Sequence, residues 1–121
     1  MILDSEATYK AYDKEQIGLG IRRLPEQIGI AWDGTRALSL PANYNGCTNV
    51  VLVGMGGSAL GSHILESVFF SRIKVPFTIV RGYSVPASVT SKTLVILSSF
   101  SGSTEEVLSA AIEAKKVKAK I

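Results

Sequence analysis

The stretch Asn49-Val-Val-Leu-Val-Gly54-Met-Gly-Gly-Ser58 decides the fold, because it joins a short apolar run to a glycine-rich loop. β-Branched valine dominates the run, and a continuous apolar run of this length is typical of a strand buried in a parallel sheet. A helical pattern follows, since Leu60, Ile64 and Val68 recur at a spacing that places them on one helix face. The sequence therefore predicts a strand, a glycine loop and a helix, in that order.

Two further apolar runs, residues 77–80 and 93–97, have the same character. The second leads into a serine-rich loop and then into another amphipathic helix that starts near Thr104. Strands that alternate with helices in this way are typical of an α/β domain with a parallel sheet. We predict a doubly wound, flavodoxin-like sheet with strand order 2-1-3. The helices that start near Ser58 and Thr104 should lie on opposite faces, because parallel crossovers are right-handed.

The first 45 residues have a different pattern. Apolar residues recur with helical spacing between about residues 12 and 32, and Pro25 interrupts them near Leu24. Proline suits the first turn of a helix, so we predict two short helices that meet near Leu24. Residues 33–49 are predicted to be a connector with room for one short strand. The expected domains are a helical entry segment, 1–45, and the first portion of an α/β domain, 46–121.

Composition excludes several classes of protein. The chain has 121 residues, a formal net charge of +3 and 46% hydrophobic residues, which is ordinary for one packed domain. Cys47 is the single cysteine, so no internal disulfide and no paired-cysteine metal site is expected. Asp4 and Glu6 stand where a signal peptide needs a basic start, which predicts a cytoplasmic protein. No apolar run reaches the ~18 residues of a membrane span.

The last residues of the chain lead to two hypotheses, one about the role of their lysines and one about the length of the protein. Four lysines lie within the last seven residues, namely Lys115, Lys116, Lys118 and Lys120. They are either a nucleic-acid contact or a solvated helix end whose cations suit the helix dipole. We favour the helix end, because no aromatic or arginine-rich pattern accompanies them, and we expect no nucleic-acid partner. Doubly wound parallel sheets usually have more than three strands. We therefore expect the chain to be the N-terminal part of a longer protein, in which residues 116–121 approach a fourth strand.

Both strand-end loops are typical of phosphate sites. Glycines between a strand and a helix let the backbone approach a ligand, and the helix N-terminus offers free N–H groups. No lysine follows the loop at 54–58, which excludes a P-loop, and a tight turn without a ligand is the alternative. In the second loop, Ser99, Ser101 and Thr104 supply hydroxyls that can donate to phosphate. Helix capping is the alternative there, because Ser103 and Glu106 have capping-box spacing.

With strand order 2-1-3 both loops should face one crevice, at the switch point where open α/β sheets bind ligands. A dinucleotide fingerprint is the rival interpretation, because Gly54, Gly56 and Ala59 match G-x-G-x-x-G/A. The second strand then ends at Arg81 instead of the acidic residue that a nicotinamide ribose requires. The fingerprint also leaves the hydroxyl-rich loop without a role, so we favour the phosphate site.

Three segments together resemble the N-terminal sugar-isomerase (SIS) domain of the bifunctional phosphoglucose/phosphomannose isomerase family. They are Gly54-Met-Gly-Gly-Ser-Ala-Leu-Gly61, Arg81-Gly-Tyr-Ser-Val-Pro86 and Ser99-Phe-Ser-Gly-Ser-Thr-Glu-Glu106. The segment Ile21-Arg-Arg-Leu-Pro-Glu-Gln-Ile28 is similar to the family's entry helices. The resemblance implies an SIS-type fold and an enzyme that interconverts glucose 6-phosphate or mannose 6-phosphate with fructose 6-phosphate. It also implies a homodimer through SIS domains in the intact protein, and we expect neither a cofactor nor a metal.

The resemblance implies site residues as well. Gly56, Gly57 and Ser58 would line the sugar and phosphate site, and Ser99, Ser101 and Thr104 would hold the phosphate. His63 and Phe100 depart from the family's usual residues, at positions that do not matter for phosphate binding. The family's catalytic Glu, His and Lys and its substrate Arg lie in later segments, so no catalytic residue is expected in this chain. Two classes stay open: part of an isomerase, and a non-catalytic SIS module that senses sugar phosphates.

Overall fold

The structure is a computed structural model that describes residues 5–121. The chain divides into two compact units, Met1–Leu40 and Pro41–Ile121, each of which is described by itself. Among residues 5–121, none of the helices combines the length and the apolar content needed to cross a membrane.

Three helices form the described part of the first unit: α1 (Glu6–Tyr12), α2 (Ile17–Arg22) and α3 (Leu24–Arg36). The Asp13 carboxylate accepts hydrogen bonds from the backbone N–H of Ile17, at 2.7 Å, and of Gly18, at 2.8 Å, and so satisfies the start of α2. Pro25 occupies the first turn of α3, as expected. The predicted pair of helices that meet near Leu24 is thus confirmed, whereas α1 was not predicted.

The second unit is built on a three-stranded parallel sheet with order β2-β1-β3. Both ladders are parallel, since the β1 register runs from Val50↔Phe77 to Val53↔Val80 with β2 and from Asn49↔Thr93 to Gly54↔Ser98 with β3. The predicted α/β class, strand order and strand direction are therefore confirmed. Residues 41–48 contain one 3-10 turn and no strand, and α3 extends past the predicted connector's start. The elements are η2 (Ala42–Tyr44), β1 (Asn49–Gly54), η3 (Gly56–Ala59), α4 (Leu60–Phe69), β2 (Phe77–Val80), β3 (Thr93–Ser98) and α5 (Glu105–Lys116).

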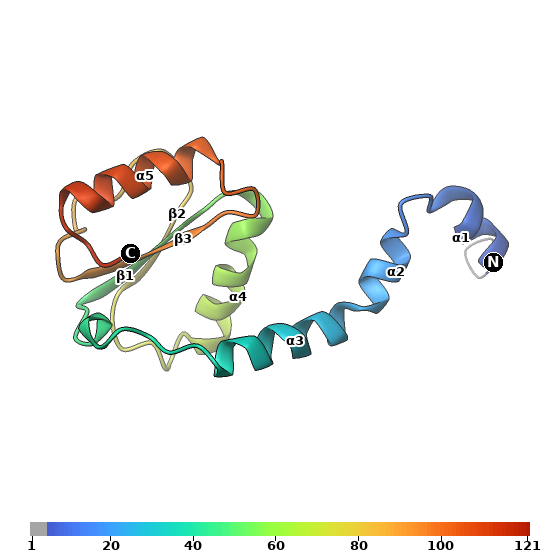
Figure 1. Cartoon of the computed structure of the whole chain (residues 1–121), viewed down its shortest axis with the longest axis horizontal. Helices are drawn as coiled ribbons and strands as arrows, with labels where there is room; N and C mark the ends of the chain where they lie inside the picture. The colour runs from blue at the N-terminus through green and yellow to red at the C-terminus, as the bar shows by residue number, and fades with distance from the viewer. Residues whose placement is uncertain (1–4) are drawn as a thin grey trace. The chain divides into compact units, whose positions relative to one another are not determined.

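The core lies on one face of this sheet. Alternate residues of a strand point to opposite faces. The odd-numbered Val51, Val53 and Val95 are buried together with small residues of α5, Ala110 and Ala114. Figure 1 shows α5 and α4 on the two sides of the sheet, which agrees with the prediction of opposite faces. The alternation within β1 and β3 therefore places the buried valines on the sheet face that α5 covers.

The other face of the sheet is less covered. Leu60, Ile64 and Val68, the predicted apolar face of α4, are each more than half exposed, and Ile96 of β3 is 40% exposed. Phe70, just after α4, is 80% exposed. The helical spacing of these residues was predicted correctly, but the second unit alone does not bury them.

The last residues of the chain run beside β3. Lys120 forms a parallel bridge with Leu94, and its carbonyl accepts a 2.7 Å hydrogen bond from the Val95 backbone N–H. The Lys120 backbone N–H donates in turn to the Thr93 carbonyl at 3.0 Å. This pairing agrees with the expected approach to a fourth strand.

Candidate functional site: the strand-end pocket

A pocket of about 600 Å³ lies at the carboxyl ends of β1 and β3. We call it the strand-end pocket, and it is lined by Gly57, Ser58, Ser98, Ser99 and Phe100. The Ser98 hydroxyl donates a 2.8 Å hydrogen bond to the Ser58 carbonyl, which ties the two loops together. The loops that were predicted to share one crevice therefore do so, at the point where the strand order reverses.

The glycines of the first loop are present for different reasons. A Cβ added to Gly54 would lie 3.2 Å from the Ser58 carbonyl oxygen and 3.3 Å from that of Ser98, so close packing favours a glycine there. Gly56 has a φ of +51°, which a side chain disfavours. Gly57 has neither constraint, because a Cβ there would meet no atom within 4 Å. Nothing in the folded chain explains the missing side chain of Gly57, which lines the pocket.

The second loop brings together the three predicted hydroxyls, Ser99, Ser101 and Thr104, which we call the hydroxyl cluster. The Ser99 and Thr104 hydroxyls share a 2.8 Å hydrogen bond, and Ser101 lies 3.4 Å from Thr104 and 3.5 Å from Ser99. The backbone N–H of Gly102 donates to Ser99 Oγ at 3.0 Å. The cluster stands at the N-terminus of α5, where backbone N–H groups favour an anion.

The capping-box interpretation of this loop is wrong. Thr104, and not Ser103, is the N-cap residue of α5, and no side chain caps the helix. The Ser103 backbone N–H and hydroxyl both donate hydrogen bonds of 3.2 Å to Ser101 Oγ, so Ser103 stabilises the loop and does not cap α5. Because the Thr104 hydroxyl is engaged with Ser99, the first turn of α5 keeps N–H groups that a ligand can meet.

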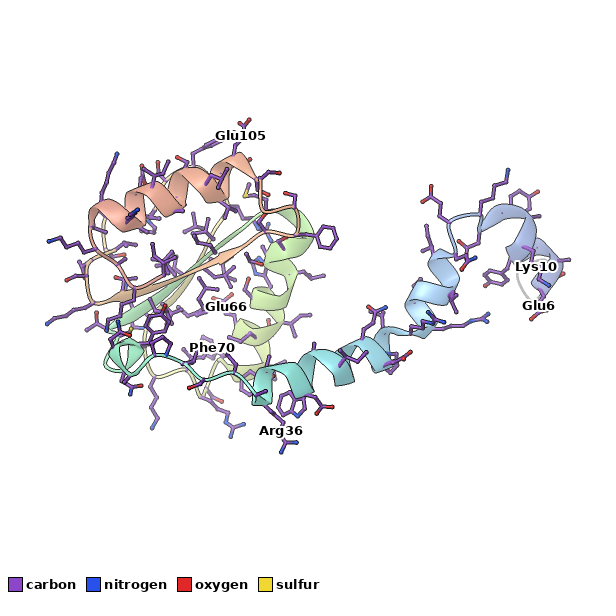
Figure 2. The ribbon with its side chains drawn as sticks, in the orientation of Figure 1. Glu6, Lys10, Arg36, Glu66, Phe70 and Glu105 are labelled. Atoms are coloured by element: carbon purple, nitrogen blue, oxygen red, sulfur yellow. The ribbon has the colours of Figure 1, made fainter. Side chains whose placement is uncertain are left out.

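Acidic side chains shape the electrostatics at this helix start. Glu105 projects from the first turn of α5 into solvent (Figure 2), where its carboxylate accepts a 3.4 Å hydrogen bond from the Tyr83 hydroxyl. The negative charge of Glu106, followed by that of Glu105, raises the pKa of Tyr83 above its ordinary value of 10.0. The shift favours the protonated phenol, which is the form that donates to Glu105. The hydroxyl cluster itself adds no charge to the site.

His63 of α4 and Arg81, which follows β2, form a second pair of polar side chains. Arg81, just after β2, places Nη2 against Nε2 of His63 on α4. The other ring nitrogen of His63 is 4.0 Å from the Glu66 carboxylate. Neither residue lines the strand-end pocket, so His63 is not positioned there as a catalytic base.

Sequence reasoning missed two residues of the pocket wall, Ser98 and Phe100. The sequence signal for both was position, because the last residue of a parallel strand and the residues that follow it lie at the ligand edge of the sheet.

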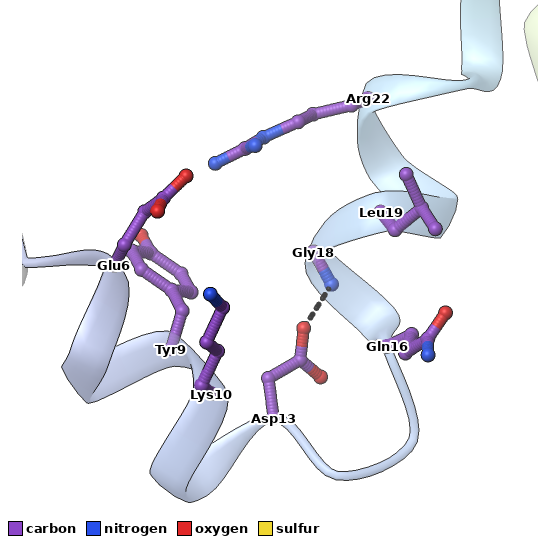
Figure 3. Close-up of a pocket in the computed structure, with 8 residues that line it drawn as sticks. All are labelled: Glu6, Tyr9, Lys10, Asp13, Gln16, Gly18, Leu19 and Arg22. Atoms are coloured by element: carbon purple, nitrogen blue, oxygen red, sulfur yellow. Dashed lines mark hydrogen bonds between the residues drawn. The ribbon is translucent and has the colours of Figure 1, made fainter.

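The first unit contains a pocket of its own, of about 340 Å³, between α1 and α2 (Figure 3). There the Asp13 carboxylate faces the backbone of Gly18, so this side chain serves the helix start.

Fold and site together define an α/β unit with a hydroxyl-rich pocket at the switch point of a parallel sheet. Comparison with curated proteins gives the particular relatives, which are bifunctional phosphoglucose/phosphomannose isomerases. The protein of that name from Caldicellulosiruptor bescii is 44% identical over 101 residues, which is 84% of this chain and 30% of the relative. The one from Thermoplasma acidophilum is 39% identical over 61% of this chain and 23% of the relative. Over most of its length the chain is thus homologous to these proteins.

The chain spans only about a third or less of the length of these relatives. No family model matches it, and no solved structure matches it. The family resemblance of the sequence is therefore confirmed through the curated relatives alone.

Proposed function

We propose that this chain supplies the sugar-phosphate-binding part of an aldose–ketose isomerase that interconverts glucose 6-phosphate or mannose 6-phosphate with fructose 6-phosphate. The observation that carries the proposal is the hydroxyl cluster, whose three members lie within 3.5 Å of one another beside the strand-end pocket. The names of the curated relatives support the choice of reaction.

In this proposal the second unit is the first portion of an SIS domain. The unit begins at Pro41, a few residues before the start at residue 46 that the sequence predicted. The hydroxyls of Ser99, Ser101 and Thr104 donate to the phosphate oxygens, and the α5 N-terminus adds its N–H groups. From the other loop, Gly57 and Ser58 line the strand-end pocket, and Gly56, which precedes them and is not part of that lining, completes the proposed sugar and phosphate site. No metal or cofactor is part of the proposal. The homodimer and the cytoplasmic location remain predictions from the sequence.

Proton transfer requires groups from elsewhere. Moving a proton between C1 and C2 of the sugar needs a base that reaches the carbon and a donor that stabilises the enediolate oxygen. Glu105 and Glu106 belong to the first turn of α5, where negative side chains suit the helix dipole, and neither lines the strand-end pocket. The proposed catalytic groups therefore lie outside the strand-end pocket as this chain builds it.

A non-catalytic module that senses sugar phosphates is the second candidate. The same pocket favours it equally, because binding through hydroxyls and N–H groups requires no base. A longer reading frame that contains the family's Glu, His and Lys would decide for the enzyme.

The binding test compares two variants of this chain. Ser101→Ala/Thr104→Ala removes two charge-assisted hydrogen bonds of about 1.5–3 kcal/mol each, so the affinity for glucose 6-phosphate should fall at least a hundredfold by calorimetry. Thr104→Ser is the matched control, because it keeps the hydroxyl, and it should bind within about threefold of the parent chain. Equal affinity of the double variant and the parent chain would refute the proposed phosphate site.

A further inference from the structure

Phe100 is the most exposed large hydrophobic side chain among residues 5–121, at 104% of its reference area. It follows β3 directly and lies between two members of the hydroxyl cluster, Ser99 and Ser101. A phenyl ring with no buried area contributes nothing to the hydrophobic core. The fold of the second unit therefore gives no reason for an aromatic side chain at this position.

The loop that carries Phe100 is fixed on both sides of the ring. On one side Ser99 shares its 2.8 Å hydrogen bond with Thr104 and accepts from the Gly102 N–H. On the other side Ser101 accepts from the Ser103 N–H at 3.2 Å. These bonds hold the backbone of the loop, so the phenyl ring is presented from a defined position beside the strand-end pocket.

The rest of the pocket leaves room for a ligand against this ring. Its other lining residues are one glycine and three serines, and the space at Gly57 is open, with no atom within 4 Å of an added Cβ. The pocket thus combines a single apolar wall with hydroxyls and backbone groups. Small-molecule sites commonly have this composition, in which an aromatic surface contacts carbon and a few polar groups fix the orientation.

We propose that Phe100 is a specificity residue that packs its ring against the carbon-bound hydrogens of a phosphorylated sugar. This inference rests on the proposed function, because the hydroxyl cluster must hold the phosphate for the sugar carbons to reach the ring. It adds a requirement to the ligand, which must carry an apolar carbon face next to its phosphate. Inorganic phosphate satisfies the hydroxyl cluster and leaves Phe100 without a contact.

Calorimetry on three variants of the chain, with two probes each, tests the inference. Phe100→Ala should weaken glucose 6-phosphate binding about 3- to 10-fold, in the range of a single aromatic contact, and leave inorganic phosphate binding unchanged. Phe100→Tyr keeps the ring face and should bind both probes like the parent chain. Phe100→Leu keeps apolar bulk without a flat face and should fall between the two. Thermal denaturation of each variant should be unchanged, because Phe100 is fully exposed.

The outcomes separate this inference from the proposed function. If Ser101→Ala/Thr104→Ala leaves both probes bound as before, the proposed phosphate site is wrong, and the inference falls with it. If that double variant loses both probes but Phe100→Ala binds the sugar phosphate normally, only the role of Phe100 is overturned. Equal losses of both probes in Phe100→Ala would also overturn it, because a carbon contact cannot affect inorganic phosphate. A shift in sedimentation of Phe100→Ala, with binding unchanged, would show an interface between chains instead.

Discussion

Gly57 is the residue at which ligand binding and folding make different demands. Its backbone conformation and its surroundings both accept a side chain in the folded chain, yet it faces the strand-end pocket. Gly57→Ala should leave the free energy of unfolding unchanged or raise it by about 0.4–1 kcal/mol, because alanine restricts the unfolded chain. The added methyl group should lower the affinity for glucose 6-phosphate at least tenfold, which is about 1.4 kcal/mol.

Gly61→Ala is the matched control for this prediction. Gly61 also has open space around it, but it lies within α4 and does not line the pocket. Its replacement should stabilise the helix by up to about 1 kcal/mol and leave ligand binding unaltered. Urea denaturation and calorimetry on both variants measure the two effects separately. If Gly57→Ala loses stability but binds with normal affinity, Gly57 is required for folding and not for ligand binding.

At the residue scale the sequence predicted which hydroxyls meet, since Ser99, Ser101 and Thr104 come within hydrogen-bond reach of one another. It could not predict how they pair. The spacing of Ser103 and Glu106 fits a capping box, but the loop turns at Gly102, with a φ of +71°, and directs Ser103 back to Ser101. Side-chain pairing within a loop depends on backbone angles that the order of residues does not specify.

At the scale of elements, β1 shows how the alternation of a strand sets stability. Val51 is fully buried against α5, whereas its neighbour Val50 is half-buried on the other face. Val51→Ala should lower the free energy of unfolding by about 2 kcal/mol, because it removes two methyl groups and leaves a cavity. Val50→Ala, the same chemical change one residue earlier, should cost less than about 1 kcal/mol. Equal losses in urea denaturation would contradict the one-sided core.

The strands were predictable because burial imposes an apolar pattern on them, and the bounds of β1 and β2 match the predicted runs. The first unit was harder to predict. None of the side chains of α1, α2 and α3 is buried, so packing does not enforce a period there. The end of α3 contains Asp33 and Gly34, which indicated a connector, although the helix continues to Arg36. The bounds of such helices must be predicted from helix propensity alone, which is a weaker signal than a pattern imposed by burial.

At the scale of the whole molecule, no carboxylate, imidazole or lysine side chain lies among the residues of the described part of the chain that line the strand-end pocket. We predict that the 121-residue chain has no measurable phosphoglucose isomerase activity. Coupled conversion of fructose 6-phosphate measures this, with the full-length isomerase of Caldicellulosiruptor bescii as the positive control. Turnover by the chain within about a hundredfold of that control, the contribution typical of one general base, would reveal a catalytic residue within these 121 positions.

The parallel register of the sheet also has a consequence for synthesis on the ribosome. Asn49 of β1 and its partner Thr93 of β3 are 44 positions apart, and no tight turn joins any two of the three strands. At ~5–20 residues per second, the ribosome needs roughly 2–9 s to complete that stretch after β1 is made. During this interval a valine-rich strand lacks its second neighbour and the helix that buries it. We therefore expect nascent β1 to be prone to association with other chains until β3 and α5 have been made.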